Sequence, residues 1–91
     1  MKYRVQAYSQ FKRDIKTAKK RHYDMSLIKT VIDDLAAGKK LNEKYHDHEL
    51  SGNYAGYREC HILPDWLLVY KLVGDTLTLV LARTGTHSDL F

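Results

Sequence analysis

The apolar positions of this chain follow first the period of a strand and then the period of helices. Within KYRVQAYS, residues 2–9, every second position is apolar or aromatic, which predicts a half-buried strand. Ser9 can then cap a helix whose apolar positions, Phe11, Ile15 and Ala18, recur every three or four residues. We therefore expect the chain to begin with a strand followed by a helix.

A second helix is predicted after Asp24, the next residue that can serve as an N-cap. Its apolar stripe stops before Gly38, a residue type that commonly follows the last turn of a helix. The stripe consists of Ile28, Val31, Ile32 and Leu35. Residues 39–54 show neither period, and we interpret them as a loop.

The second half of the chain has the pattern of strands. Residues 57–62 alternate, and if Cys60 and Ile62 face the core, His61 must face the opposite, solvated side. Pro64 ends this strand. The following segment, WLLVYKLV, is apolar at nearly every position, which is typical of a central strand covered on both faces. A short turn then leads into LTLVLA.

These elements predict an α+β fold with the order βααβββ. Its length of 91 residues suits one compact core, so residues 1–91 are interpreted as a single domain. We expect a mainly antiparallel sheet of about four strands, with the two N-terminal helices packed on one face and the functional groups on the other.

Composition narrows the class of protein. A single cysteine, Cys60, cannot form an internal disulfide, and the charged N-terminus does not suit a signal peptide. No apolar run approaches the roughly 20 residues that a membrane-spanning helix needs. We therefore expect a cytoplasmic protein that does not act in a membrane.

The charge is unevenly distributed. Residues 1–44 carry 12 lysines and arginines against 5 acidic residues, whereas residues 45–91 carry 3 against 6. Four of the five histidines lie in the second half. A polyanion could be held by the first half and acted on by the second. The basic side chains of the first predicted helix that would make such a contact are Lys12, Lys16, Lys19 and Lys20.

Several motifs of the second half resemble one family. The combination of DHEL, GYRECH, PDW and RTGTH, together with the earlier SQFKRDIKTAKKR, is similar to the YafQ branch of the RelE/ParE superfamily. That resemblance covers essentially the whole chain and implies a RelE-like fold. It also implies a ribosome-dependent endoribonuclease, the toxin of a type II toxin–antitoxin pair. Such a toxin cleaves translated mRNA in the ribosomal A site, stops growth and is neutralised by a cognate antitoxin, through which the complex binds operator DNA.

The family pattern, carried over position by position, implies a set of site residues. Those expected to act in catalysis are His48, His61, Asp65 and His87, and those expected to bind substrate are Arg83, Trp66 and Phe91. RNA contains its own nucleophile, the 2′-hydroxyl, so acid–base catalysis by histidines needs neither a metal nor another cofactor. We assign the general acid to His87 and leave the base among the other three, of which Asp65 could also orient a histidine. Arg83 is the candidate phosphate clamp. The four lysines of the first predicted helix are expected to contact ribosomal RNA.

Other interpretations remain open at this stage. Trp66 and Phe91 could be core or anchoring residues, and Asp65, which follows a proline, could be only a turn residue. The side chains of HDH, residues 46–48, together with His61, Asp65 and His87, could instead bind a metal ion in a metal-dependent hydrolase. A non-enzymatic ParE-like toxin or a co-repressor that acts by binding a protein is the third possibility.

Overall fold

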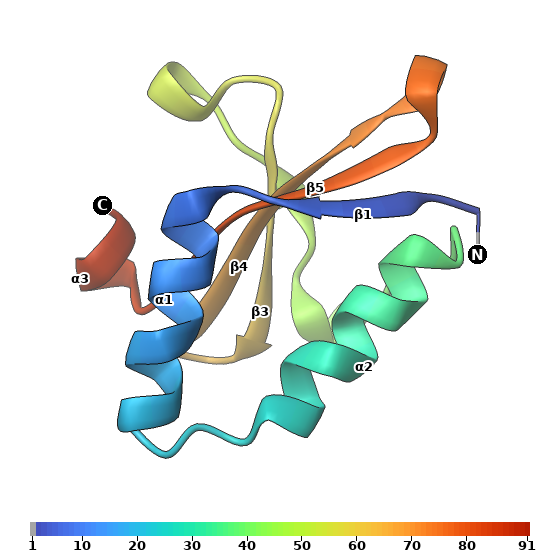
Figure 1. The fold of residues 1–91 in the computed structure, drawn as a ribbon. Coiled ribbons are helices and arrows are strands. Elements are labelled where there is room, and N and C mark those ends of the chain that lie inside the picture. The colour runs from blue at the N-terminus through green and yellow to red at the C-terminus, as the bar shows by residue number, and fades with distance from the viewer. Residues whose placement is uncertain (1) are drawn as a thin grey trace.

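A computed structural model describes residues 2–91, and Met1 lies outside the described residues. Figure 1 shows a twisted sheet with two long helices on the same side of it. In chain order, the helices and strands are β1 Arg4–Ala7, α1 Ser9–Lys20, α2 Met25–Ala36, β2 His48–Glu49, β3 Arg58–Leu63, β4 Trp66–Val73, β5 Thr78–Gly85 and α3 His87–Leu90. Short 3-10 turns in the connections include η1 Glu43–Tyr45, η2 Gly52–Tyr54 and η3 Gly74–Thr76.

The strands form one sheet in the order β1-β5-β4-β3-β2. Strand β1 runs parallel to β5, and all other neighbours are antiparallel. The predicted α+β class and mainly antiparallel sheet are confirmed, but the sheet has five strands rather than about four. The additional strand is β2, which lies in the segment that we predicted to be loop. Both β2, with two residues, and α3, with four, are too short for hydrophobic periodicity to reveal them.

The two helices begin at different kinds of residue. Helix α1 starts with Ser9 itself, Tyr8 occupies the N-cap position, and no side chain caps the helix, so the predicted Ser9 cap is wrong by one residue. Helix α2 begins as predicted, because the Asp24 carboxylate accepts a hydrogen bond from the Ser26 backbone N–H at 2.9 Å. This bond satisfies one of the backbone N–H groups that the first turn leaves free.

Strand β4 lies at the centre of the core. Its residues Trp66, Leu68 and Tyr70 pack toward α1 and α2, whereas Leu67 and Val69 belong to a second cluster on the opposite face. The prediction of a central strand covered on both faces is therefore confirmed. The helix-side core also contains Phe11, Ala18, Ile28, Val31, Leu35, Ala36, Leu41, Cys60, Ile62, Leu79 and Leu81.

The single cysteine is part of this core. Cys60 is fully buried, and burial raises the pKa of its thiol to about 12. A thiol that stays protonated at neutral pH is a poor nucleophile, so Cys60 acts as a small apolar core residue. As for membranes, none of the helices within residues 2–91 has the length and apolar character needed to cross one.

Candidate active site

The site is built on the face of the sheet that points away from α1 and α2. His48 of β2 lies directly opposite Glu59 of β3 in the antiparallel register, and His61 lies two residues further along β3. Neighbouring partners and every second residue of a strand share a face, so all three side chains lie on one side. Cys60 and Ile62 are buried on the other side, as predicted.

A carboxylate lies between two imidazoles in this arrangement. Glu59 Oε1 is 3.6 Å from His48 Nε2 and 3.7 Å from His61 Nε2. The Glu59 side chain is only 8% exposed, whereas those of His48 and His61 are 50% and 29% exposed. The imidazoles therefore face solvent or a ligand while the carboxylate lies behind them. We call these three residues the histidine–glutamate cluster.

Backbone carbonyls fix the protonation pattern of both rings. His48 Nδ1 lies 2.9 Å from the His46 carbonyl oxygen, and His61 Nδ1 lies 3.3 Å from the Pro64 carbonyl oxygen. A carbonyl can only accept a hydrogen bond, so the Nδ1 atom of each ring must carry the hydrogen. The neutral rings thus present an unprotonated Nε2 that can accept a proton.

Asp47 holds the loop that carries His48. Its Oδ1 accepts a hydrogen bond of 2.5 Å from the Tyr70 hydroxyl of β4, and its Oδ2 accepts two, of 3.0 and 3.2 Å, from the Arg58 guanidinium of β3. The hydrogen bond to Asp47 raises the pKa of Arg58. The pKa of Tyr70 is raised mainly by burial and, to a smaller extent, by the Asp47 carboxylate. In the HDH motif the aspartate therefore anchors the loop and the flanking histidines remain available.

Asp65 does not take the orienting role that we considered for it. It lies exposed in the tight turn between β3 and β4, and no hydrogen bond within residues 2–91 joins it to a histidine. The contacts that orient His61 come from Glu59 and the Pro64 carbonyl instead. Asp65 as a proton carrier stays a prediction.

Trp66 and Arg83 are both committed to structural contacts. Trp66 is 1% exposed, and its indole N–H donates a 2.9 Å hydrogen bond to Thr84 Oγ1, so it cannot stack on a base in this structure. Arg83 Nε donates a 2.8 Å hydrogen bond to Asp14 Oδ2, and this carboxylate raises the pKa of Arg83. The expected stacking of Trp66 is therefore corrected to core packing. Phosphate binding by Arg83 stays a prediction, because its side chain is 24% exposed and the ion pair leaves other N–H donors of the guanidinium free to bind.

The C-terminal residues lie on the same face as the cluster. Leu90 of α3 packs into the second core cluster with Leu67, the register partner of His61. His87 is exposed, and its ring centroid lies 5.2 Å from that of Phe91, which is itself 52% exposed. No hydrogen bond, ion pair or ring contact within residues 2–91 joins His87 to His48 or His61.

Helix α3 is held by its own cap and by an ion pair to α1. The Thr86 hydroxyl and the Asp89 carboxylate cap the first turn reciprocally, a capping box. Arg21 also binds Asp89 through two hydrogen bonds, of 2.6 and 3.1 Å, and this guanidinium holds the pKa of the carboxyl well below its usual range. These contacts position the helix that begins at His87.

The four lysines of the predicted RNA-binding surface are exposed on α1, and the polar face of that helix also carries Arg13. They lie on the helix side of the molecule, whereas the histidine–glutamate cluster lies on the other face of the sheet. Contact with ribosomal RNA stays a prediction.

Sequence reasoning missed two residues that shape the site. Glu59 shares the strand face of His61 because the two are separated by two positions, so the alternation that placed His61 could also have placed Glu59. Asp47 gave no such signal, because its partner Tyr70 is 23 residues away in the chain.

The proposed metal-binding set is not assembled. Asp47 turns toward Arg58, Asp65 lies in its turn, and His87 is on α3. Within residues 2–91, no group of three or more histidine, cysteine, aspartate or glutamate side chains is arranged to hold a metal ion.

Comparisons with known proteins give consistent matches. The family model described as the bacterial toxin of the type II toxin–antitoxin system, YafQ, matches residues 3–91. The mRNA interferase toxin YafQ of Escherichia coli K12 is 41% identical over 88 residues, which cover 96% of this chain and 94% of that protein.

Solved structures match along nearly the whole chain. The crystal structure of a metal-bound toxin from Helicobacter pylori has a TM-score of 0.92 and 39% identity, covering 98% of this chain and 99% of that one. YafQ in the crystal structure of the E. coli DinJ–YafQ complex has a TM-score of 0.89 and 40% identity, covering 98% of each chain.

The geometry predicts that Asp47→Asn will loosen the loop that carries His48. The variant removes the charge that binds Arg58, so we expect the free energy of unfolding to fall by about 1–3 kcal/mol. Histidine ¹⁵N NMR should show His48 changing from a single Nδ1–H tautomer to a mixture.

Glu49→Gln is the matched control. Glu49 is next to His48 but is 84% exposed and lies 3.6 Å from Arg58, so its loss should change the unfolding free energy by less than about 0.5 kcal/mol. A single His48 tautomer in the Asp47→Asn protein would contradict the anchoring role.

Proposed function

Because the chain belongs to the YafQ family of bacterial type II toxin–antitoxin toxins, we propose that it is an mRNA interferase, an endoribonuclease that cleaves translated mRNA in the ribosomal A site. The observation that carries the proposal is the histidine–glutamate cluster on the face of the sheet away from α1 and α2. The protein would act in the cytoplasm, where translating ribosomes are found.

The cluster suits removal of a proton from the 2′-hydroxyl of RNA. His48 and His61 each hold their hydrogen on Nδ1, so either Nε2 can take that proton. The Glu59 carboxylate beside both Nε2 atoms would stabilise the imidazolium that forms. The base is therefore proposed to be His48 or His61 rather than Asp65. The 2′-oxygen then attacks phosphorus, and the P–O5′ bond breaks.

His87 is proposed to protonate the departing 5′-oxygen. Its ring is exposed at the start of α3, a helix that packs on the same face as the cluster. The Phe91 ring beside it would stack on a base or hold the tail in place. Asp65, exposed in its turn near the cluster, is kept as a secondary site residue.

The proposed partners follow from the same family. The E. coli relative is found in a complex with DinJ, and we propose that a cognate antitoxin neutralises this chain. The antitoxin would also carry the complex to operator DNA. The ribosome and its mRNA complete the set of partners.

Two alternatives have to be separated from this mechanism. A ParE-like toxin or co-repressor would bind a protein and cleave nothing. A metal-dependent hydrolase deserves a direct test because a similar H. pylori toxin is described as metal-bound.

A substrate lacking one 2′-hydroxyl tests the proposal. Translating ribosomes carrying normal mRNA should be cleaved, and the upstream fragment should end in a 2′,3′-cyclic phosphate or its hydrolysed form. An mRNA with a 2′-deoxy nucleotide at the cleavage position should stay uncut, because its nucleophile is missing. A transition-metal chelator should leave the normal reaction unchanged, although magnesium is still needed by the ribosome.

Histidine variants supply the controls for that assay. His48→Ala, His61→Ala and His87→Ala should each slow cleavage by about 100-fold or more. His22→Asn changes an exposed histidine of the α1–α2 connection with a positive φ that asparagine tolerates, and should leave the rate unchanged. Cleavage of the deoxy substrate together with inhibition by the chelator would favour a metal-activated water, and no cleavage at all would favour a binding toxin.

Glu59→Gln should separate activity from stability. The variant removes a nearly buried charge whose basic neighbours in the cluster are imidazoles, so we expect unfolding stability to be equal or up to about 1 kcal/mol higher. Cleavage should become at least about tenfold slower because the imidazolium loses its counterion. Glu49→Gln is the matched control, and equal cleavage rates for the two variants would exclude a role for Glu59.

Ribosome binding should depend on the basic face of α1. Reversing the charge of Lys12, Lys16, Lys19 and Lys20 together should weaken binding and reduce the slope of log affinity against log salt by about 3. Reversing Lys39 and Lys40, which are exposed beyond α2, is the control. Unchanged affinity and slope after the fourfold reversal would show that α1 is not the docking surface.

A further inference from the structure

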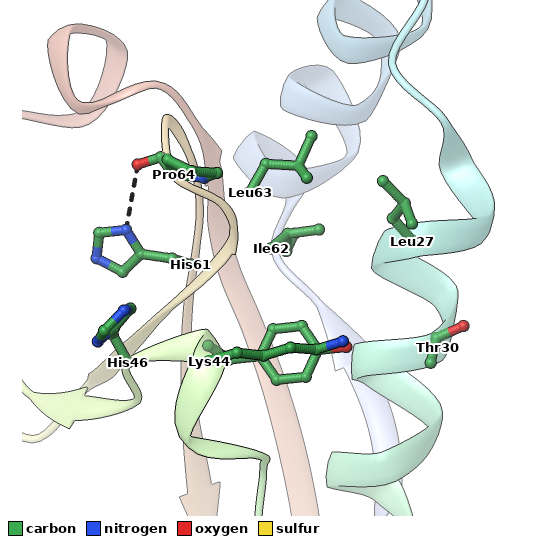
Figure 2. Close-up of a pocket in the computed structure, with 9 residues that line it drawn as sticks. Leu27, Thr30, Lys44, His46, His61, Ile62, Leu63 and Pro64 are labelled. Atoms are coloured by element: carbon green, nitrogen blue, oxygen red, sulfur yellow. Dashed lines mark hydrogen bonds between the residues drawn. The ribbon is translucent and has the colours of Figure 1, made fainter.

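A cavity of about 580 Å³ opens beside the histidine–glutamate cluster. Figure 2 shows Leu27 and Thr30 of α2 on one side of it, His46 and His61 on the other, and Leu63 between them. The mechanism described above uses His61 but leaves this cavity without a role.

The cavity is mainly apolar, with polar side chains on both sides of it. Leu27 and Leu63 are 36% and 47% exposed, and both present apolar surface to the cavity. Tyr45 adds an aromatic ring, and Lys44 Nζ lies 5.1 Å from the centre of that ring. No acidic residue is among those that line the cavity. These features suit a flat, weakly polar group attached to an anion.

The cavity and the proposed catalytic groups are continuous. The His46 and His61 rings both line the cavity, and their centroids are 5.8 Å apart. The His61 ring lies 6.4 Å from that of His48, across the cluster. A ligand whose phosphate is at the cluster would therefore place its next substituent at the mouth of the cavity.

We propose that this cavity binds one nucleobase of the mRNA, next to the phosphate that is cleaved, and so contributes to sequence preference. The inference rests on the proposed function, because the base is delivered by a scissile phosphate at the cluster. Single-stranded RNA is commonly recognised by bases that leave their stack and lie against aromatic or apolar side chains. Tyr45, Leu27 and Leu63 supply such a surface, and Lys44 supplies a cation for the backbone.

A nucleobase explains the position of the cavity better than a peptide segment does. An antitoxin side chain could fill an apolar cavity anywhere on the surface, whereas a base has to lie within one nucleotide of the reacting phosphate. The shared His61 wall meets this requirement. The antitoxin remains the competing occupant, and the experiment has to exclude it.

Abasic substitution combined with a cavity variant tests the proposal. Removing the base at each position near the cleaved bond should identify one position where wild-type kcat/KM falls by roughly tenfold, the size expected for one stacked base. In Leu63→Ser the normal mRNA should be cleaved more slowly, and removing the same base should then have little further effect. Leu72→Ser, which changes another exposed leucine, should keep the wild-type dependence on that base.

A binding measurement keeps the test independent of cleavage. With 2-aminopurine placed in turn at each position of the A-site codon of a 2′-deoxy mRNA on the ribosome, wild-type protein should change the fluorescence at one position and Leu63→Ser should not. If wild type failed to cleave any mRNA yet gave this change, the proposed function would fail while the cavity assignment stood.

Two results would overturn the assignment. One is that removing each base changes kcat/KM by the same factor in wild type and in Leu63→Ser. The other is a Leu63→Ser protein that loses affinity for its antitoxin at least tenfold but keeps the wild-type abasic profile, which would identify the cavity as an antitoxin site.

Discussion

The burial of β4 on both faces determines how the residues of the site are held. Trp66 and Tyr70 are each about 1% exposed, yet each carries one polar group that needs a hydrogen-bond partner inside the protein. The Trp66 N–H bonds to Thr84 of β5, and the Tyr70 hydroxyl bonds to Asp47 ahead of β2. The central strand thereby fixes Asp47, the residue before His48, and Thr84, which lies three residues before His87.

The two short elements that contain His48 and His87 have little structure of their own. The strand that contains His48 is only two residues long, and the helix that begins at His87 has four. Isolated elements of this length are not stable, so their positions depend on tertiary contacts. Asp47 supplies them for the first segment, and Asp89, bound by Arg21, supplies them for the second. The proposed catalysis therefore depends on Asp47, Asp89 and Arg21, which would position the histidines without contacting the substrate.

The sequence predicted the parts of the fold that have a period and missed the parts that depend on distant partners. The alternation of β3 placed His61 correctly on the solvated face, because strand geometry is local. The stacking expected of Trp66 was wrong because the side chain is buried and bonded to Thr84, 18 residues away, and the ion pair of Arg83 with Asp14, 69 residues away, was not predicted. A motif records which residue types are present, but it does not record which neighbour each one binds.

The surroundings of the histidines differ in a way that matches their proposed tasks. A proton taken up by His48 or His61 would lie beside the nearly buried Glu59 carboxylate, where the charge is balanced within the protein. His87 has an exposed ring and no carboxylate partner among the ion pairs of residues 2–91, so it can regain a proton from solvent after giving one up. Burial of Glu59 disfavours the fold unless the imidazoles compensate, which is typical of a side chain kept for chemistry rather than for stability. The asymmetry between the pair and the single histidine is therefore the structural basis for assigning base and acid.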